Sequence, residues 1–166
     1  MNAGAYGGQI ADVLISSEVY DTLHNRVFTL TAEEHELAYR HSIFAEHPEY
    51  IILSSTFALR RGNAEEIMQK VREQAASRRE KQPLNFPSVG STFKRPEGHF
   101  AGKLIEDAGL KGTRVGGAVV SEKHAGFIVN RGGATAEDVK RVVEHIQRTV
   151  YQNYSVELDC EIKFIQ

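Results

Sequence analysis

The chain is 166 residues long, with 41% hydrophobic and 25% charged residues, a composition typical of an ordinary globular protein and not of a disordered or fibrous one. Twenty Lys and Arg against 22 Asp and Glu give a formal net charge of −2, so no bulk positive field exists to hold a polyphosphate, and we expect no nucleic-acid partner. The single Cys160 excludes an intrachain disulfide, and no apolar run approaches the ~20 residues that span a bilayer, so we expect no membrane insertion.

The first third of the chain predicts short strands. A partial period-two pattern from Ile10 to Tyr20 indicates a half-buried strand, and residues 26–30 are predicted to be its hairpin partner. Thr31 with Glu34 forms a capping box, which predicts one short helical turn. Residues 50–59 then read as a strong strand.

A helix follows, and after it the amino-acid composition changes. Asn63 with Glu66 is a capping signal, and apolar residues at fourfold spacing predict a helix that ends near Arg79. From Lys81 the string KQPLNFPSVGSTFKRPEG holds three of the four prolines and two glycines, so we expect irregular structure there. We place the boundary between two domains here, with residues 1–82 in the first and 83–166 in the second.

The second half predicts a small α+β sandwich. The elements expected after residue 99 are a short helix over 100–108 closed by Gly109, strands over 115–120 and 127–129, a helix opened by Thr135 and Asp138, and an alternating strand over 156–164. This order places helices on one face of a short sheet.

Three glycines near the start are candidates for a binding loop. Gly4, Gly7 and Gly8 in GAYGG could let backbone amides approach a phosphate or an aromatic cofactor ring. The spacing is neither GxGxxG nor a P-loop, so by itself it favours a tight turn before the strand.

Three further residues could carry chemistry, and each has a plain structural alternative. Arg40 lies in a stretch without a helical or strand pattern. Its guanidinium could bind a carboxylate or stabilise developing negative charge, or it could be an exposed loop arginine. Ser91 follows Gly90 on an expected turn, which could hold its hydroxyl towards a ligand, but a structural serine is the commoner case. Glu161 shares the polar face of the last predicted strand, where a solvated side chain is the default.

The histidines predict no metal site. All seven are scattered, and one cysteine cannot anchor a metal cluster. His41 and His47 are six residues apart in a loop-like stretch, so we predict that both are exposed.

Seven segments carry a family resemblance when they are taken in order: MNAGAYGG at 1–8, YRHS at 39–42, KQPL at 81–84, PSVGSTFKRPEG at 87–98, AGKLIEDAGLKG at 101–112, VGGAVVSEKHAGFIVN at 115–130 and LDCEI at 158–162. Together they closely resemble the UDP-N-acetylenolpyruvoylglucosamine reductases, flavoenzymes of peptidoglycan precursor synthesis that are also called UDP-N-acetylmuramate dehydrogenases.

The resemblance implies a reaction and three catalytic residues. In that family NADPH reduces bound FAD, and the reduced flavin passes hydride to the double bond of UDP-N-acetylglucosamine enolpyruvate. By position, Arg40 and Glu161 match the residues that steady the enolic intermediate, and Ser91 matches the serine that protonates the α-carbon.

The resemblance also implies binding residues. Lys81, Arg95 and His124 occupy positions where relatives hold polar or basic residues near the diphosphate and enolpyruvyl groups. A segment close to the flavin is matched by Gly4, Ala5, Tyr6 and Gly7. Residues 59–63 lead straight into the helix without the extra loop of one family branch, so the chain resembles the shorter, loop-lacking type.

The length departs from the family, whose members are about twice as long. The resemblance implies an α+β fold that opens inside the FAD-binding, PCMH-like lobe, up to about residue 82, and continues into the substrate-binding lobe. We therefore expect the chain alone to bind FAD weakly or not at all. Full-length relatives are usually monomers, but unpaired apolar strands here favour self-association.

Two other readings stay open. The chain could be a UDP-sugar-binding module without catalytic activity, or a subunit that needs a separate amino-terminal flavin lobe. The absence of a signal peptide and the origin of the nucleotide-sugar substrate imply a cytoplasmic location.

Overall fold

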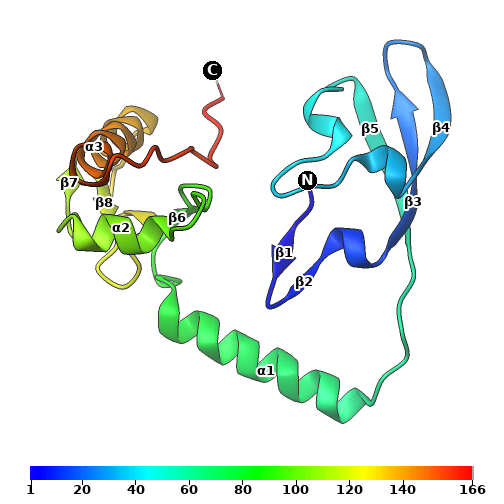
Figure 1. Ribbon diagram of the computed structural model, residues 1–166, viewed down its shortest axis with the longest axis horizontal. Coiled ribbons are helices and arrows are strands. Elements are labelled where there is room, and N and C mark those ends of the chain that lie inside the picture. The colour runs from blue at the N-terminus through cyan, green and yellow to red at the C-terminus, as the bar shows by residue number, and fades with distance from the viewer. Residues whose placement is uncertain (166) are drawn as a thin grey trace. The chain divides into compact units, whose positions relative to one another are not determined.

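A computed structural model of the chain describes residues 1–165 and divides into two compact units, Met1–Asn63 and the part that begins at Ala64 (Figure 1). Helices are mixed with sheets whose strands pair antiparallel, which confirms the predicted α+β class. Among the described helices, none carries an apolar stretch long enough to cross a membrane.

The first unit is built on a three-stranded sheet of order β4-β3-β5. Its strands are β3 (Leu14–Asp21), β4 (Arg26–Thr31) and β5 (Tyr50–Phe57). The predicted hairpin is confirmed, although the strand begins only at Leu14 because Ile10–Asp12 forms a 3₁₀ turn (η1). Strand β5 is also confirmed and ends two residues before the predicted boundary.

Short turns complete this unit: β1 (Gly4–Ala5), β2 (Gly8–Gln9), η2 (Glu33–His35) and η3 (Ile43–Ala45). The predicted capping box is confirmed, because a carboxylate oxygen of Glu34 accepts a 2.8 Å hydrogen bond from the Thr31 main chain. His35 is buried and bonds at 2.9 Å to Ser17 Oγ, which in turn lies 2.7 Å from Ser55 Oγ. This network joins η2 to the central strand.

Helix α1 (Ala64–Lys81) opens the second unit. Its existence is confirmed, and it continues two residues beyond the predicted end. Every residue of α1 is exposed or half-buried. The predicted apolar face is therefore present in the sequence but is not buried, and Ile67 and Val71 are each about half exposed (49% and 50%).

The rest of the second unit packs two helices on one face of a four-stranded sheet. The sheet has the order β6-β9-β8-β7, and its strands are β6 (Ser88–Ser91), β7 (Arg114–Val115), β8 (Ala118–Val120) and β9 (Phe127–Asn130). Helices α2 (Ala101–Asp107) and α3 (Ala136–Tyr154) confirm the two predicted helices. Ile105 of α2 and Ile146 of α3 are fully buried against Val120 and Ile128 of the sheet.

Three predicted elements in this unit are wrong. The strand predicted over 115–120 is a hairpin, because a turn at Gly116 and Gly117 separates β7 from β8. Residues 88–91 form strand β6 where irregular structure was predicted, because β9 supplies main-chain hydrogen bonds that local composition does not reveal. Residues 156–164 do not form a strand, since their pairing is limited to the Phe93–Cys160 bridge and the two main-chain hydrogen bonds that flank it. Their alternation reflects burial, with Leu158 only 3% exposed, and it fails at Phe164, which is 44% exposed.

Candidate functional site

The glycine segment forms a tight hairpin at the start of the first unit. Ala5 pairs with Gly8, and the two intervening residues, Tyr6 (φ 53°) and Gly7 (φ 82°), have left-handed backbones. This pattern is typical of a two-residue hairpin turn, so the turn expected from the spacing is confirmed. Gly4, Ala5, Tyr6 and Gly7 are all exposed.

Arg40 lies in a second tight turn of the same unit. The main chains of Ala38 and His41 bond to each other (3.1 and 3.4 Å), and Arg40 has a left-handed φ of 56°. The Asn2 N–H donates to the His41 carbonyl at 3.2 Å, which ties the turn to the amino-terminal segment. Arg40 is half-buried with its guanidinium 5.4 Å from the centre of the Tyr39 ring, so the exposed-loop reading is wrong.

Ser91 is the last residue of β6 and not part of a turn as expected. It pairs with Phe127, and the register shifts between Ser88 and Ser91. Gly90, with φ 75°, lies in this irregularity, where a glycine has no steric cost. Strand irregularities of this kind redirect side chains near active sites. The Ser91 side chain is exposed.

Glu161 lies beside the residue that follows Ser91. The Glu161 N–H donates to the Thr92 carbonyl at 2.8 Å, and on the other side the Thr92 N–H donates to the Gly126 carbonyl at 2.9 Å. Glu161 is half-buried, whereas Glu157 and Asp159 are exposed, so its prediction as part of one solvated face is wrong. The main chain of Thr92 is thus bonded both to Gly126, just before β9, and to the carboxy-terminal segment.

His124 lies in the turn before β9, the strand that pairs with Ser91. Its ring lies edge-on to the Phe127 ring at 4.9 Å, and its Nδ1 accepts a 3.1 Å hydrogen bond from the Gly126 N–H. In the neutral ring this places the proton on Nε2, which becomes a donor. A Cβ at Gly102 or Gly126 would lie 3.2 or 3.0 Å from His124 Cε1, so both glycines make room for the ring.

The main-chain segments that carry Ser91, His124 and Glu161 therefore lie side by side, although they are distant in sequence. Arg95 is exposed in the loop that follows, with Nε donating to the His99 carbonyl at 3.3 Å and the guanidinium 4.0 Å from the Phe100 ring centre. Lys81 is the exposed last residue of α1.

Two buried groups near this site were not singled out by the sequence. The Thr92 hydroxyl oxygen is buried and has no hydrogen-bond partner within the described part of the chain. The half-buried Cys160 thiol lies 3.6 Å from the Thr92 carbonyl, and burial raises its pKa. No local pattern distinguishes either residue, because both are defined by packing across the sheet.

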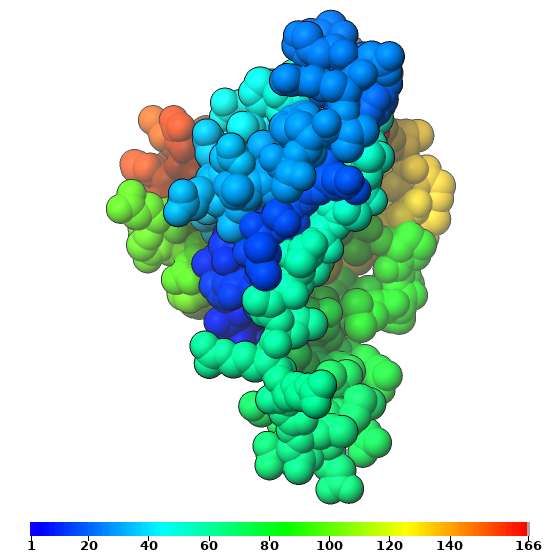
Figure 2. Space-filling view, turned by 90° about the vertical axis from the view of Figure 1, so that its right-hand side faces the viewer, coloured from blue at the N-terminus to red at the C-terminus, as the bar shows by residue number. Residues whose placement is uncertain are grey.

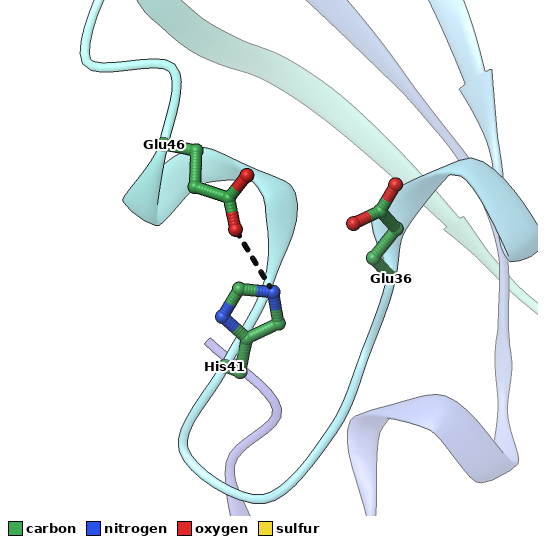
Figure 3. A group of neighbouring side chains, drawn as sticks. All are labelled: Glu36, His41 and Glu46. Carbon is green, nitrogen blue, oxygen red and sulfur yellow. Dashed lines mark ion pairs between the residues drawn. The ribbon is translucent and has the colours of Figure 1, made fainter.

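Three ionisable groups converge elsewhere, in the first unit (Figure 3). Glu36, His41 and Glu46 each offer a ligand atom, and these atoms lie within 4.8 Å of one another. His41 Nε2 is 3.6 Å from Glu46 Oε1, and both carboxylates are exposed. His41 and His47 are half-buried, so the prediction that both are exposed is wrong, and His47 stacks on Tyr50. The spacing in sequence did not suggest this cluster.

A comparison with protein-family models shows which family the chain belongs to. The family model described as "UDP-N-acetylenolpyruvoylglucosamine reductase, C-terminal domain" matches residues 82–165, just over half of the chain. The chain belongs to this family. The resemblance identified from the seven sequence segments is thereby confirmed.

Individual reductases agree with the family assignment. A UDP-N-acetylenolpyruvoylglucosamine reductase from Lachnoclostridium phytofermentans is 52% identical over 99% of this chain and 53% of its own length. The protein of the same name from Caldanaerobacter subterraneus is 53% identical over 99% of this chain and 54% of its own length. The chain thus spans about half the length of the curated relatives it matches.

A solved structure supports the reductase fold. The crystal structure of UDP-N-acetylenolpyruvylglucosamine reductase (MurB) from Thermus caldophilus matches with a TM-score of 0.80 and 37% identity. The match covers 97% of this chain and 57% of that one.

Proposed function

We propose that this chain takes part in the reduction of UDP-N-acetylglucosamine enolpyruvate to UDP-N-acetylmuramate in the cytoplasm, with FAD and NADPH as the redox cofactors. Family membership supports the reaction class. The observation that carries the proposal is the placement of Glu161 beside Thr92, and hence beside Ser91, by a main-chain hydrogen bond.

The chemistry requires a proton donor and a group that stabilises charge. Hydride addition to the β-carbon of the enol ether places negative charge on the α-carbon and, through conjugation, on the carboxylate. We assign Ser91 to donate a proton to the α-carbon, so that one hydrogen is added to each carbon of the double bond. A serine hydroxyl is a weak acid, and it is competent only towards a strongly basic carbanion in a site without water.

The carboxylate of the substrate is assigned to Arg40 and Glu161. Arg40 supplies a permanent cation on a turn that main-chain bonds hold in place. Glu161 is half-buried, where its protonated form can donate a hydrogen bond to the developing enolate. A group that binds the charge more tightly in the transition state than in the ground state lowers the barrier.

Binding roles are proposed for three further residues. The Nε2–H of neutral His124 is a suitable donor to an anionic oxygen, and its ring orientation is set by Phe127 and Gly126. Lys81 and Arg95 are exposed cations suited to the diphosphate of a UDP-sugar. We retain residues 1–82 and 83–166 as the proposed functional domains.

The glycine hairpin fits a flat cofactor ring. A Cβ added at Gly7 or Gly8 would meet no atom within 4 Å, so the backbone is open to close approach there. Gly4, Ala5, Tyr6 and Gly7 would form one side of an FAD site. When bound, the flavin supplies the hydride after its reduction by NADPH.

The first experiment is the visible absorbance spectrum of the purified chain after incubation with FAD and removal of the excess. Retained flavin bands, followed by NADPH-dependent reduction of the enolpyruvate substrate, would support the full proposal. In a chain with these activities, Ser91→Ala should leave flavin reduction intact and slow substrate reduction by roughly 10²- to 10⁴-fold.

A colourless protein would mean that the chain does not retain FAD, and substrate binding would then be measured by itself. A rise in melting temperature with UDP-N-acetylglucosamine enolpyruvate would then support the alternative of a UDP-sugar-binding module. Absence of both flavin retention and a substrate-induced shift would contradict the proposal.

A further inference from the structure

Three side chains of the first unit converge between the short turns η2 and η3 (Figure 3). Glu36 directly follows η2, Glu46 directly follows η3, and His41 lies in the segment between them. One atom of each side chain, a carboxylate oxygen or a ring nitrogen, lies within 4.8 Å of the other two. The group therefore offers one nitrogen and two oxygen donors at a single place, of which the histidine is half-buried and both carboxylates are exposed.

The main chain holds all three residues in position. Glu36 and Glu46 each close a 3₁₀ turn, and their N–H groups donate to the Glu33 and Ile43 carbonyls at 3.1 and 3.0 Å. The N–H and the carbonyl of His41 also take part in main-chain hydrogen bonds, on a turn that is tied to the amino-terminal segment. Only side-chain torsions have to adjust when these donors close on a ligand, so little ordering cost remains at binding.

The negative charge of this group is not neutralised by a permanent cation. Within residues 1–165, neither Glu36 nor Glu46 forms an ion pair with a lysine or an arginine. Glu46 Oε1 lies 3.6 Å from His41 Nε2, and the Glu36 carboxylate has no side-chain partner in the same range of residues. Two carboxylates this close repel each other, and a divalent cation between them would neutralise both.

The distances and the donor types fit zinc. In a tetrahedral zinc site with metal–ligand distances of about 2.0–2.2 Å, the ligand atoms are roughly 3.3–3.6 Å apart. The 3.6 Å distance between His41 Nε2 and Glu46 Oε1 already falls in this range. Glu36 has to approach by about 1 Å, which rotation about the bonds of an exposed side chain supplies. An imidazole nitrogen favours zinc over Mg²⁺ and Ca²⁺, whose preferred ligands are oxygens.

We propose that Glu36, His41 and Glu46 bind a zinc ion. His41 coordinates through Nε2, each glutamate coordinates through one carboxylate oxygen, and water takes the fourth position. The site lies wholly in the first unit, and none of its ligands is a residue that we assign to the reductase reaction. Zinc binding therefore does not depend on the proposed function and can be tested without flavin or substrate.

The test is isothermal titration of the 166-residue chain with zinc chloride near neutral pH. We expect one zinc ion per chain, and we expect Mg²⁺ at the same concentration not to compete. His41→Gln, Glu36→Gln and Glu46→Gln should each weaken zinc binding by at least about tenfold, because each removes one of three protein ligands. His47→Gln is the matched control, since His47 lies in the same unit with its Nδ1 2.8 Å from Glu49 and outside the group of three.

Two further measurements identify the ligands and detect misfolded variants. X-ray absorption at the zinc edge should show nitrogen and oxygen ligands without sulfur, which excludes Cys160. Zinc should raise the melting temperature of the unmodified chain and of His47→Gln, but not that of His41→Gln. Glu36→Gln should melt at the same temperature as the unmodified chain when zinc is absent, because the Glu36 carboxylate has no partner within residues 1–165 to lose.

Three results would overturn the inference. The first is the absence of saturable binding at a zinc concentration of about 100 μM. The second is a loss of affinity in His47→Gln as large as that in His41→Gln, since the zinc would then not distinguish the proposed ligands from another histidine. The third is a sulfur ligand in the absorption spectrum, which would place the zinc at Cys160.

Discussion

The main-chain N–H of Glu161 donates a 2.8 Å hydrogen bond to the carbonyl of Thr92. The next bond along the same pair of segments runs from the Lys94 N–H to the Asp159 carbonyl at 2.8 Å. Together these bonds hold the carboxy-terminal segment against the end of β6. A residue far along the chain is thus placed one position away from Ser91, where neither helix nor strand periodicity would have put it.

The buried hydroxyl of Thr92 should be dispensable for stability. Thr92 is fully buried, and its hydroxyl oxygen has no hydrogen-bond partner within residues 1–165. An unsatisfied buried hydroxyl is costly, so Thr92→Val, which keeps the shape, should raise the free energy of unfolding by about 1 kcal/mol. Urea unfolding followed by circular dichroism measures the change.

Ser121→Ala is the matched control for that substitution. Ser121 is also buried, but its hydroxyl oxygen accepts bonds from the Lys123 and His124 main chains at 3.2 and 3.3 Å. Its loss should lower the free energy of unfolding by about 1–2 kcal/mol. Destabilisation by Thr92→Val of the same size would show that its hydroxyl has a partner after all.

Asp21 should make the first unit sensitive to acid. Burial acts to raise the pKa of Asp21, but hydrogen bonds from the His24 main chain and ring and from the Leu23 main chain outweigh it and lower the pKa. A carboxyl whose pKa is lower in the folded state stabilises the fold above its unfolded pKa, about 3.9. This contribution is lost as the pH falls through the lower folded value.

Melting temperatures between pH 2 and pH 7 test this expectation. Asp21→Asn should melt at a lower temperature at neutral pH and show a flatter dependence below pH 4. Glu33→Gln, at an exposed position of the same unit, is the control and should follow the unmodified chain. An unchanged acid profile in Asp21→Asn would refute the assignment.

Gly117 should not accept a side chain. A Cβ at this position would overlap the Ala134 nitrogen and the Gly132 oxygen, both of which are backbone atoms. We expect Gly117→Ala to cost about 3 kcal/mol, because backbone cannot rotate out of the way as a side chain can. Gly8→Ala, whose Cβ meets nothing within 4 Å, should change stability by less than about 0.5 kcal/mol. Thermal unfolding compares the two variants, and equal effects would contradict the prediction.

The outer edge of β5 should cause self-association. This strand ends the sheet order of the first unit, carries no charged residue, and exposes Ile51 and Leu53 by 50% and 54%. Figure 2 shows part of the segment around β5, in turquoise, at the surface of the view. An uncharged edge strand is a template for pairing with another chain. Sedimentation velocity should therefore detect association that increases with concentration.

A lysine at the β5 edge should reduce this association. Leu53→Lys introduces a charge into the edge strand, whereas Leu59→Lys, at a 77% exposed position outside the strand, should leave association unchanged. A chain that stays monomeric at all concentrations, or equal effects of the two lysines, would exclude the β5 edge as the contact.

Local patterns predicted the elements whose causes are local. The β3–β4 hairpin followed from alternation over neighbouring residues, and α3 followed from its amino-terminal cap and its apolar stripe. The cap is present, since the Thr135 hydroxyl accepts from the Asp138 N–H at 3.1 Å and the Asp138 carboxylate accepts from the Thr135 N–H at 2.9 Å. Side chains within four residues of each other determine these features.

Two of the wrong elements have non-local causes. Strand β6 exists because β9, more than 30 residues later, supplies its hydrogen bonds. The segment 156–164 alternates because Leu158 packs into the core, but burial alone does not make a strand, and the segment pairs with residues 92–94 only around the Phe93–Cys160 bridge.

For the site, the sequence by itself determined the family, through seven ordered segments, and with it the identity of the candidate residues. By their own patterns Arg40, Ser91 and Glu161 were no different from ordinary surface residues. Only the tertiary structure decided that the segments carrying Ser91, His124 and Glu161 meet at one end of a sheet. The reason is physical: hydrogen bonds between segments separated by more than 30 residues bring these groups together, and such pairing leaves no periodic trace in the chain.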